Sequence, residues 1–376
     1  MNESCSSETK TVEQLLQDLR QHDWSVNWKT ADALAEAGEQ AFPHLLQALK
    51  DTDGYVRNGA AIALGKIGNS DATEPLIGAL QWRDDRVYED DEDREALTSA
   101  ATALGKLRNV AACQVLRAEL GKFPSSVDST LASYIAEALA EIGDPEAVPV
   151  LAKAVEAGDF ELIGVASRAL AKLGAAGIKE LLRLGANRAQ HGRALIIRAL
   201  GTNSVRSATP LLLQILHEPS GDKFVRCQAA EALGKIGESS EVFPILLAML
   251  QSADEEVRPG VLSGLGALHD ARAYGAIVKQ LDSPRHRYTA IMALGVLGDP
   301  RACDLLTKML KSEDESSAIH AATALGKIGC HDALPLLTQL HERMTTSDSP
   351  VSKANAGAVE RAVQKLQERR NRSTPE

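Results

Sequence analysis

The sequence predicts an all-α fold, a right-handed α-solenoid of about ten helix pairs that ends in a closing helix. Two observations support this prediction. A short motif of the form Ala-Leu-Gly-Lys-Ile-Gly returns along the chain at intervals of 29 to 40 residues. In addition, only 3% of the 376 residues are aromatic, whereas 44% are hydrophobic. A thin, repetitive helical core needs few aromatic side chains, unlike the core of a large globular domain.

The repeat is anchored on a leucine with small residues on both sides. The residue before this leucine is alanine in nine units, and the residue after it is always glycine or alanine. Small residues let neighbouring helices approach closely. Apolar residues four positions before and three positions after the leucine place one stripe on the helix. The ten anchor leucines are Leu34, Leu64, Leu104, Leu139, Leu170, Leu200, Leu233, Leu265, Leu294 and Leu325.

Flanking residues predict where the helices of each unit begin and end. A first helix (helix A) is followed by a turn, by the helix that carries the leucine (helix B) and, in most units, by a glycine stop. An aspartate eleven positions before the leucine is expected to cap helix B, and an arginine four positions later to bond within and between repeats. The aspartates are Asp23, Asp53, Asp93, Asp128, Asp159, Asp222, Asp254 and Asp314, and the arginines are Arg57, Arg193, Arg226, Arg258 and Arg287.

The repeat pattern also predicts the domain organisation. We expect a disordered N-terminus at 1–10, the solenoid at 11–345, and a closing helix with a basic tail at 346–376. The unit at 175–204 departs from the pattern, because Ala189 replaces the cap aspartate and Asn203-Ser204 replaces the usual apolar residue and glycine. This departure predicts a bend in the array.

An acidic insertion at 83–95 makes one unit longer than the others. It contains eight acidic residues against three arginines. One interpretation is a solvated acidic loop. The other is a docking loop for a basic partner, with Trp82 and Tyr88 as anchors. A calcium site is disfavoured, because the regular ligand spacing and the turn glycine of a hand-type loop are absent.

Charge and cysteine content exclude several classes of protein. The net charge of −10 disfavours nucleic acid as a partner, since DNA-binding proteins carry a basic face. The five cysteines form no C-x-x-C pair and no even-numbered disulfide framework, so we expect free thiols in a reducing compartment. No signal peptide and no apolar run of membrane-spanning length are present. We therefore expect no membrane partner and a cytoplasmic location.

The segment LLQALKDTDGYVRNGAAIALGKIG at 45–68 resembles the short HEAT-like repeats of the phycobilisome bilin-lyase class. The resemblance covers about 320 residues and implies the solenoid fold. Repeats of this kind serve lyases, hydroxylases and plain scaffolds, so the resemblance leaves the function open. For a lyase it implies a tetrapyrrole in the concave groove, with Arg168 and Arg198 available to its propionates and Trp28 or Tyr288 to its rings.

Positions six and two residues before the leucine belong neither to the apolar stripe nor to the cap. The second helices of such solenoids usually line the concave surface, so these positions predict partner contacts. Together with the two aromatic residues proposed as anchors of the docking loop, the candidate partner-binding residues are Trp28, Asn58, Trp82, Tyr88, Arg168, Arg198, Glu231 and Tyr288.

Apart from the repeat, the sequence contains no motif typical of a catalytic or metal-binding site. The pairs His217-Glu218 and His341-Glu342 fall near the ends of A helices, where paired iron ligands could not converge. Nucleophile-elbow, P-loop and zinc spacings are absent. We therefore expect no catalytic residue, metal or cofactor. The sequence favours a non-catalytic scaffold that binds another protein, and the alternative is a bilin lyase or tetrapyrrole-handling chaperone acting on a phycobiliprotein.

Overall fold

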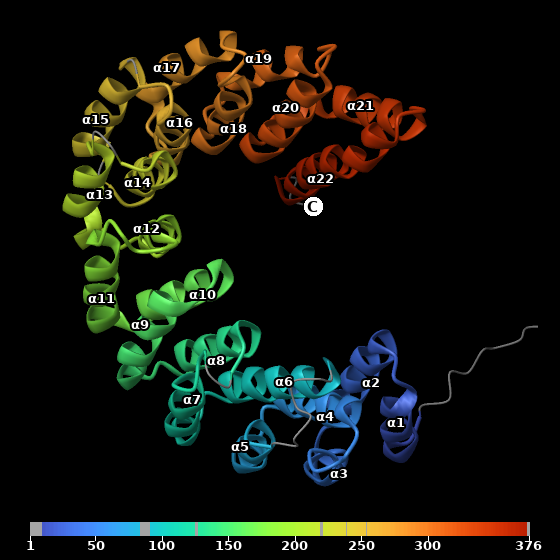
Figure 1. Ribbon diagram of the computed structural model, residues 1–376. Coiled ribbons are helices and arrows are strands. Elements are labelled where there is room, and N and C mark those ends of the chain that lie inside the picture. Colours follow the sequence, from blue (N-terminus) through green and yellow to red (C-terminus); the bar gives the residue numbers. More distant parts are fainter. Residues whose placement is uncertain are drawn as a thin grey trace, which may run out of the picture. The chain divides into compact units, whose positions relative to one another are not determined.

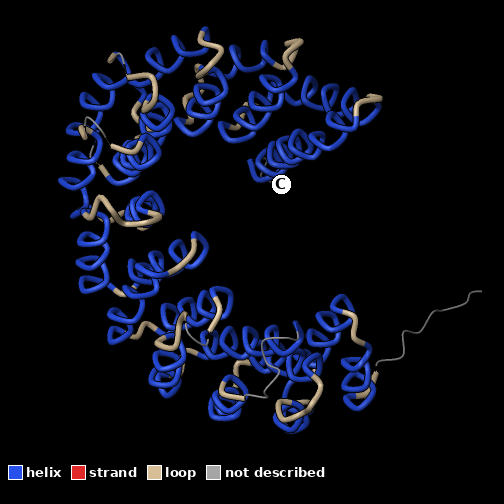
Figure 2. Tube along the Cα trace, viewed as in Figure 1, coloured by secondary structure: helices blue, strands red, loops and turns tan. Residues whose placement is uncertain are grey.

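The computed structural model describes residues 10–82, 91–124, 127–218, 221–237, 239–252 and 254–373. Every regular element in these ranges is helical, which confirms the predicted all-α class (Figure 2). The chain forms two compact units, which meet between Ala199 and Leu200. This boundary lies inside the segment 175–204, and the bend proposed there stays a prediction.

The first unit contains alternating A and B helices (Figure 1). The A helices are α1 (Val12–Asp18), α3 (Phe42–Ala48), α5 (Thr73–Leu80), α7 (Cys113–Leu120), α9 (Val148–Ala157) and α11 (Gly174–Ala186). The B helices are α2 (Trp24–Glu36), α4 (Gly54–Ile67), α6 (Asp91–Leu107), α8 (Ser129–Ile142) and α10 (Phe160–Lys172). Helix α12 (Arg193–Thr202) begins in the first unit and ends in the second.

The second unit repeats the same alternation. Its A helices are α13 (Thr209–Leu216), α15 (Ser239–Gln251), α17 (Tyr274–Val278), α19 (Ala302–Met309) and α21 (Leu334–Thr346). Its B helices are α14 (Lys223–Ile236), α16 (Arg258–Ala267), α18 (Arg287–Leu297), α20 (Glu315–Ile328) and α22 (Pro350–Ser373). Within the described ranges, no helix is at once long and apolar enough to cross a membrane.

Close packing of successive B helices explains the small residues of the repeat motif. A Cβ atom added at Gly65, directly after the anchor leucine of α4, would lie 2.9 Å from the Cα of Ala103, directly before the anchor leucine of α6. Gly105 meets Ala138 of α8 at the same distance. Glycine in one helix therefore faces alanine in the next, and the predicted close approach is confirmed. In each unit the B helices pack more closely than the A helices, so they form the inner layer.

The closing helix α22 takes the place of an eleventh B helix. It packs against both α20 and α21, as B helices do in earlier repeats. A Cβ atom at Gly326 of α20 would lie 3.1 Å from Ala362 of α22, which repeats the glycine–alanine contact. The inner face of α22 buries Val359 and Leu366. The helix thus covers an apolar surface of α20 that would otherwise be exposed at the end of the array.

Five of the eight predicted cap aspartates accept backbone N–H groups at the start of a B helix. They are Asp23, Asp53, Asp128, Asp159 and Asp222. The prediction is wrong for Asp93, which lies inside the first turn of α6, and for Asp254, because α16 begins only at Arg258. Asp314 is the N-cap residue of α20, but its carboxylate accepts hydrogen bonds from the Ser317 and Tyr288 hydroxyls in place of a regular side-chain cap.

The arginine column joins successive repeats, as predicted. In the first unit, Arg57 donates to the carbonyl oxygen of Asp51 at 2.7 Å and to the carboxylate of Asp93 in the next repeat. In the second unit, Arg226 lies 2.7 Å from the carboxylate of Asp254. The two arginine–carboxylate contacts run between the starts of neighbouring B helices. Asp93 and Asp254, which do not cap a helix, therefore stabilise the array by pairing with an arginine of the preceding repeat.

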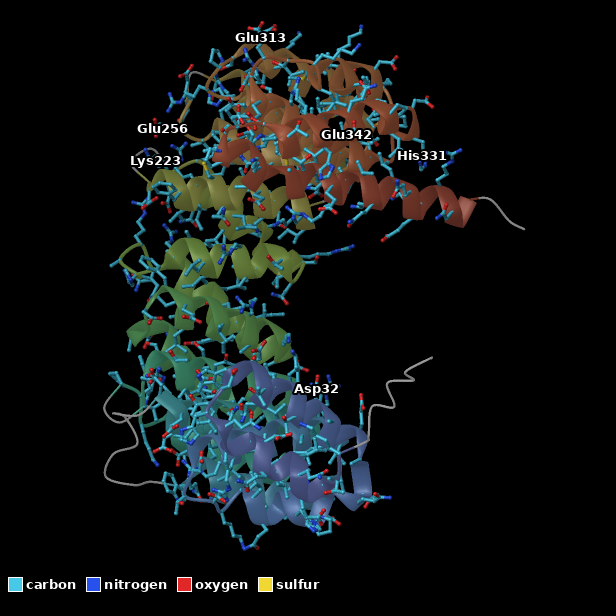
Figure 3. All side chains as sticks on the ribbon, turned by 90° about the vertical axis from the view of Figure 1, so that its right-hand side faces the viewer. Asp32, Lys223, Glu256, Glu313, His331 and Glu342 are labelled. Carbon is cyan, nitrogen blue, oxygen red and sulfur yellow. A yellow bond between two sulfur atoms is a disulfide. The ribbon has the colours of Figure 1, made fainter. Side chains whose placement is uncertain are left out.

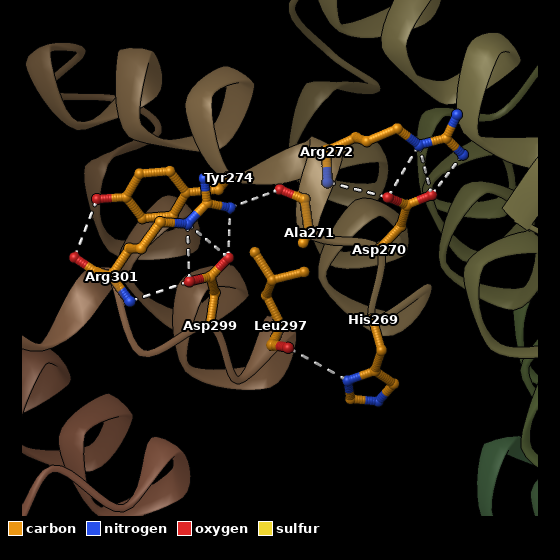
Figure 4. A network of polar contacts seen from close by, with 8 residues as sticks. All are labelled: His269, Asp270, Ala271, Arg272, Tyr274, Leu297, Asp299 and Arg301. Carbon is orange, nitrogen blue, oxygen red and sulfur yellow. Dashed lines mark hydrogen bonds and ion pairs between the residues drawn. The ribbon is translucent and has the colours of Figure 1, made fainter.

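Arginine and aspartate also fix the turns that lead into A helices of the second unit (Figure 4). Asp299 accepts three hydrogen bonds from the Arg301 guanidinium, the shortest at 2.5 Å, and the same guanidinium donates to the Ala271 carbonyl at 2.8 Å. It also lies 4.4 Å from the ring centroid of Tyr274. A surface pair of Lys223 and Glu256 adds an inter-repeat contact at 2.9 Å (Figure 3).

The cysteine prediction needs a correction. Cys303 of α19 and Cys330, directly after α20, form a disulfide with their Cα atoms 5.7 Å apart. These two cysteines are therefore not free thiols, whereas Cys113 and Cys227 are free. Equivalent turns of adjacent helices come together in a solenoid, so two cysteines 27 residues apart can meet although they form no short-range motif.

Candidate partner-binding groove

A groove crosses the B-helix layer of the first unit. Its floor consists of Ala61, Ile62 and Gly65 of α4 and Ala103 of α6, and its cavity has a volume of about 120 Å³. The small floor residues are those that the close approach of α4 and α6 requires. Repeat packing thus leaves a shallow apolar depression on the inner layer.

Two exposed aromatic side chains stand at the sides of the groove. Trp28 projects from α2 and Tyr134 from α8, so the residues that line one cavity come from four successive B helices. Trp28 is 53% exposed and Tyr134 is 40% exposed. Large exposed aromatic side chains beside an apolar hollow are typical of interaction surfaces. The groove is therefore the candidate functional site of the described residues.

A buried polar chain fixes the helices under the groove. The Asn58 amide of α4 donates to the Asn27 side chain of α2 at 2.9 Å, and the Ser99 hydroxyl of α6 donates to the Asn58 side chain at 2.7 Å. Asn27 in turn donates to the Tyr55 carbonyl oxygen at 2.8 Å. Because each buried polar group has a partner, the chain stabilises one arrangement of the three helices.

The structure separates the predicted contact positions into two kinds. Trp28 lines the groove, but Asn58 is only 2% exposed and its side chain bonds two neighbouring helices. Asn58 is therefore corrected from a contact residue to a packing residue. Four residues of α6 that line the groove form one stripe along the helix: Glu95, Ser99, Thr102 and Lys106. Relative to the anchor leucine, Leu104, they occupy positions −9, −5, −2 and +2 in that order. Tyr134 lies five positions before its leucine, one residue away from the predicted column.

Of the two predicted anchors of the docking loop, the structure describes Trp82 but not Tyr88. Trp82 is half-buried, with its ring centroid 3.9 Å from the guanidinium carbon of Arg57. It therefore packs on Arg57, the arginine that joins two successive repeats of the first unit. Tyr88 and most of the insertion, 83–90, lie outside the described residues. The docking role of the insertion stays a prediction.

The remaining candidates do not line the groove. Arg168 and Arg198 are exposed at equivalent positions of α10 and α12, and the Arg168 guanidinium donates to the Gly164 carbonyl of its own helix at 3.2 Å. Glu231 of α14 pairs with Lys235 at 2.6 Å. Tyr288 of α18 stacks on His320 with centroids 5.1 Å apart. None of these residues belongs to the lining of the groove.

A larger hollow lies at the beginning of the first unit. It has a volume of about 770 Å³ and lies among α1, α2 and α3, between Lys10 and His44. No large aromatic side chain lines it, and its charged members include the weakly paired Glu13 and His44, 3.9 Å apart. Volume alone does not identify a site, so the aromatic groove remains the stronger candidate.

Metal-ligating and nucleophilic side chains were candidates for a reactive site. Within the described residues, no three His, Cys, Asp or Glu side chains gather in a way that could hold a metal ion. Burial raises the pKa of the Cys113 and Cys227 thiols, so both are protonated and unreactive at neutral pH. What the groove offers is apolar contact and shape, which suit binding.

Comparison with family models finds repeats over most of the chain. The model of HEAT repeats matches 12–89, 180–266 and 275–360, and that of the PBS lyase HEAT-like repeat matches 131–157. Together these matches reach into both compact units.

Curated relatives and solved structures share parts of this repeat. Protein YibA of Escherichia coli is 30% identical over 125 residues, 33% of this chain and 44% of YibA. The chain thus spans less than half of the length of that relative. Phycocyanobilin lyase subunit alpha of Nostoc sp. is 29% identical over 259 residues, 65% of this chain and 80% of the subunit. A Kap121p mutant structure aligns with a TM-score of 0.50 at 13% identity, over 95% of this chain and 45% of Kap121p, which shows a likeness of fold alone.

Proposed function

The chain belongs to the HEAT-repeat family, and from this premise we propose that it is a non-catalytic scaffold that binds another protein on its inner B-helix layer. The groove between Trp28 and Tyr134 is the proposed contact site. The partner is a protein that the chain itself does not identify. Neither nucleic acid nor a membrane surface is part of the proposal, because the net charge is −10.

The observation that carries the proposal is the pair of exposed aromatic side chains around an apolar cavity of about 120 Å³. Tryptophan and tyrosine are enriched among the residues that dominate protein interfaces, because they bury large areas with few rotatable bonds. The small residues beneath them are held by close helix packing. A rigid floor with aromatic walls loses little entropy when a partner binds.

A second candidate function is that of a bilin lyase or tetrapyrrole-handling chaperone with a phycobiliprotein partner. The similarity to phycocyanobilin lyase subunit alpha supports it, at 29% identity. The groove supports it less, because about 120 Å³ is well below the ~300–1,000 Å³ of pockets that enclose drug-sized ligands. Arg168 and Arg198 would be the propionate-binding residues of this candidate.

The two candidates are tested by purifying the tagged chain from its native cell. Bound proteins are identified by mass spectrometry, and visible absorbance reports a chromophore. The variants are Trp28→Ala with Tyr134→Ala in the groove and, as a matched control, Val110→Ala. Val110 is 75% exposed and lies in the turn after α6, outside the groove.

We expect a colourless preparation with a protein partner that the groove variant loses and the control retains. A coloured preparation would favour the second candidate. Retention of every partner by the groove variant would contradict the proposed contact site.

The cytoplasm is the proposed compartment. The Cys303–Cys330 disulfide counts against it, since cytoplasmic thiols are normally kept reduced. Trapping of thiols in intact cells, followed by mass spectrometry of both cysteines, tests the compartment. Reduced cysteines in the cell would support the proposal, whereas a fully oxidised pair would oppose it.

A further inference from the structure

In three repeats, the lysine two positions after the anchor leucine forms an ion pair with a carboxylate. The carboxylate lies at one of three places. It can be two positions before the leucine of the preceding B helix, two positions after that leucine, or one turn earlier on the same helix as the lysine. The three pairs are Lys66 with Asp32, Lys172 with Glu141 at 2.8 Å, and Lys235 with Glu231 at 2.6 Å. Figure 3 shows Asp32 on the surface of α2.

Lys106 occupies the same position on α6 but has none of these partners. The three equivalent positions hold Ile62, Lys66 and Thr102. In the part of the chain that the structure describes, the Lys106 ammonium group forms no hydrogen bond or ion pair, and it is exposed at the lining of the groove. Lys66, at one of these three positions, is itself a cation paired with Asp32, so it offers Lys106 no hydrogen-bond acceptor. One end of the groove therefore presents a cation that the repeat leaves uncompensated.

Glu95 lines the same groove from the first turns of α6. It is half-buried, and its carboxylate forms no hydrogen bond or ion pair within the described ranges. Its neighbour Arg94 bonds instead to Asp91, at 2.5 Å. Glu95 and Lys106 are eleven residues apart on one helix face, which corresponds to about 16 Å along the axis. The groove thus has an anionic end and a cationic end.

The cavity between these ends has room for one side chain. An apolar cavity of about 150 Å³ holds a benzene ring, so about 120 Å³ suits a single aliphatic side chain. A docked helix would present several apolar residues at helical spacing and would need a longer apolar groove. An extended peptide needs only one anchor and spans about 16 Å with about five residues.

We propose that the groove binds an extended segment of a partner protein, with one aliphatic side chain between Trp28 and Tyr134, a basic group at Glu95 and an acidic group at Lys106. This inference rests on the proposed function and names the chemistry of the partner. Charge complementarity favours this occupant, since a linear tetrapyrrole carries its formal charges only on its two propionates and would leave Glu95 without a cation. A segment of mixed charge satisfies both ends.

The test is binding of the full chain to an array of capped six-residue serine peptides with one internal leucine. The end residues are lysine, glutamate or glutamine in all combinations, so both chain directions are sampled. The chain is used as wild type, Glu95→Gln, Lys106→Gln and Trp28→Ala. Val110→Ala serves as the control, and biliverdin is added as a competitor.

Peptides with lysine at one end and glutamate at the other should bind better than peptides with two like charges. Glu95→Gln should remove the advantage of lysine, and Lys106→Gln that of glutamate, each by up to about fivefold, as for partly exposed ion pairs. Trp28→Ala should weaken all peptides, while Val110→Ala should weaken none. Displacement by biliverdin would overturn the inference in favour of the second candidate.

Binding that depends on Trp28 but ignores charge would overturn this inference and leave the proposed function standing. Failure of every peptide to bind would also overturn it, because the inference requires a short extended segment to be sufficient. If the native partner binds without regard to Trp28 and Tyr134, the proposed contact site itself is wrong. The two failures are therefore distinguishable.

Discussion

The guanidinium carbon of Arg57 lies 3.9 Å from the ring centroid of Trp82. The same guanidinium donates a hydrogen bond to the carboxylate of Asp93. Trp82 directly precedes the acidic insertion and Asp93 lies near its end, so one buried arginine holds both sides of the insertion. Arg57, which the repeat pattern predicts to bond between repeats, thus also contacts residues at either end of the acidic insertion.

Arg57→Met should destabilise the first unit by about 3–5 kcal/mol, because it leaves the nearly buried Asp93 carboxylate without its cation. The control is Arg20→Met, which removes the exposed Arg20–Asp51 pair and should cost no more than about 1 kcal/mol. Urea denaturation followed by circular dichroism measures both. Equal losses in the two variants would contradict the structural role of Arg57.

Two glycine substitutions should change stability in opposite directions. A Cβ atom at Gly65 would lie 2.9 Å from Ala103, so Gly65→Ala should cost about 1–3 kcal/mol by separating α4 and α6. Gly78 of α5 has open space around the added atom, so Gly78→Ala should stabilise the chain by about 0.5–1 kcal/mol through helix propensity. Thermal denaturation measures both. Two shifts of the same sign would contradict the packing account.

The second unit should lose stability as the pH falls below about 6.5, the ordinary pKa of histidine. His286 is 1% exposed, and both its ring nitrogens lack hydrogen-bond partners in the described residues. Burial lowers its pKa, and the nearby Arg258 and Arg285 lower it further, against an opposing effect of Glu255. The unfolded state therefore binds the proton first, and stability is fully present only above about pH 6.5.

His286→Val tests this pH dependence. Valine occupies the equivalent position of four other repeats, and it removes the unsatisfied nitrogens. The variant should be more stable by about 1 kcal/mol at neutral pH and should lose the decrease between pH 6.5 and 5. A decrease of the same size in the variant would show that another group titrates.

Reduction of Cys303–Cys330 should destabilise the second unit. The disulfide closes a loop with a sequence separation of 27, for which the chain-entropy model gives about 3–4 kcal/mol. Unfolding of the wild type should therefore occur at lower urea concentration in the presence of dithiothreitol. Cys303→Ala with Cys330→Ala should resemble the reduced protein and should not respond to dithiothreitol.

The repeat architecture could be predicted because its physical causes recur at fixed spacing. Gly65 against Ala103 and Gly105 against Ala138 are the same contact in successive repeats, so one motif reports many interfaces. Cap aspartates such as Asp53 and Asp128 follow the same logic. Asp93 does not cap a helix, because it lies within the first turn of α6 and not before it.

The groove was only partly predictable. Trp28 stood out because aromatic residues are scarce, but Tyr134 belongs to a column one residue away from the predicted one. A column position becomes solvent-facing or buried according to how neighbouring B helices cross, and the burial of Asn58 follows from this three-dimensional relation. The disulfide between Cys303 and Cys330 depends on the same stacking of turns.

The most direct test of the central claim is photo-crosslinking in the native cell. Benzoylphenylalanine replaces Thr102, which lines the groove, or Val110, which is exposed outside it. The proposed scaffold function predicts a discrete protein adduct at position 102, reduced by Trp28→Ala and Tyr134→Ala, and a weak or absent adduct at position 110. Equal adducts at both positions, or no protein adduct at position 102, would contradict it.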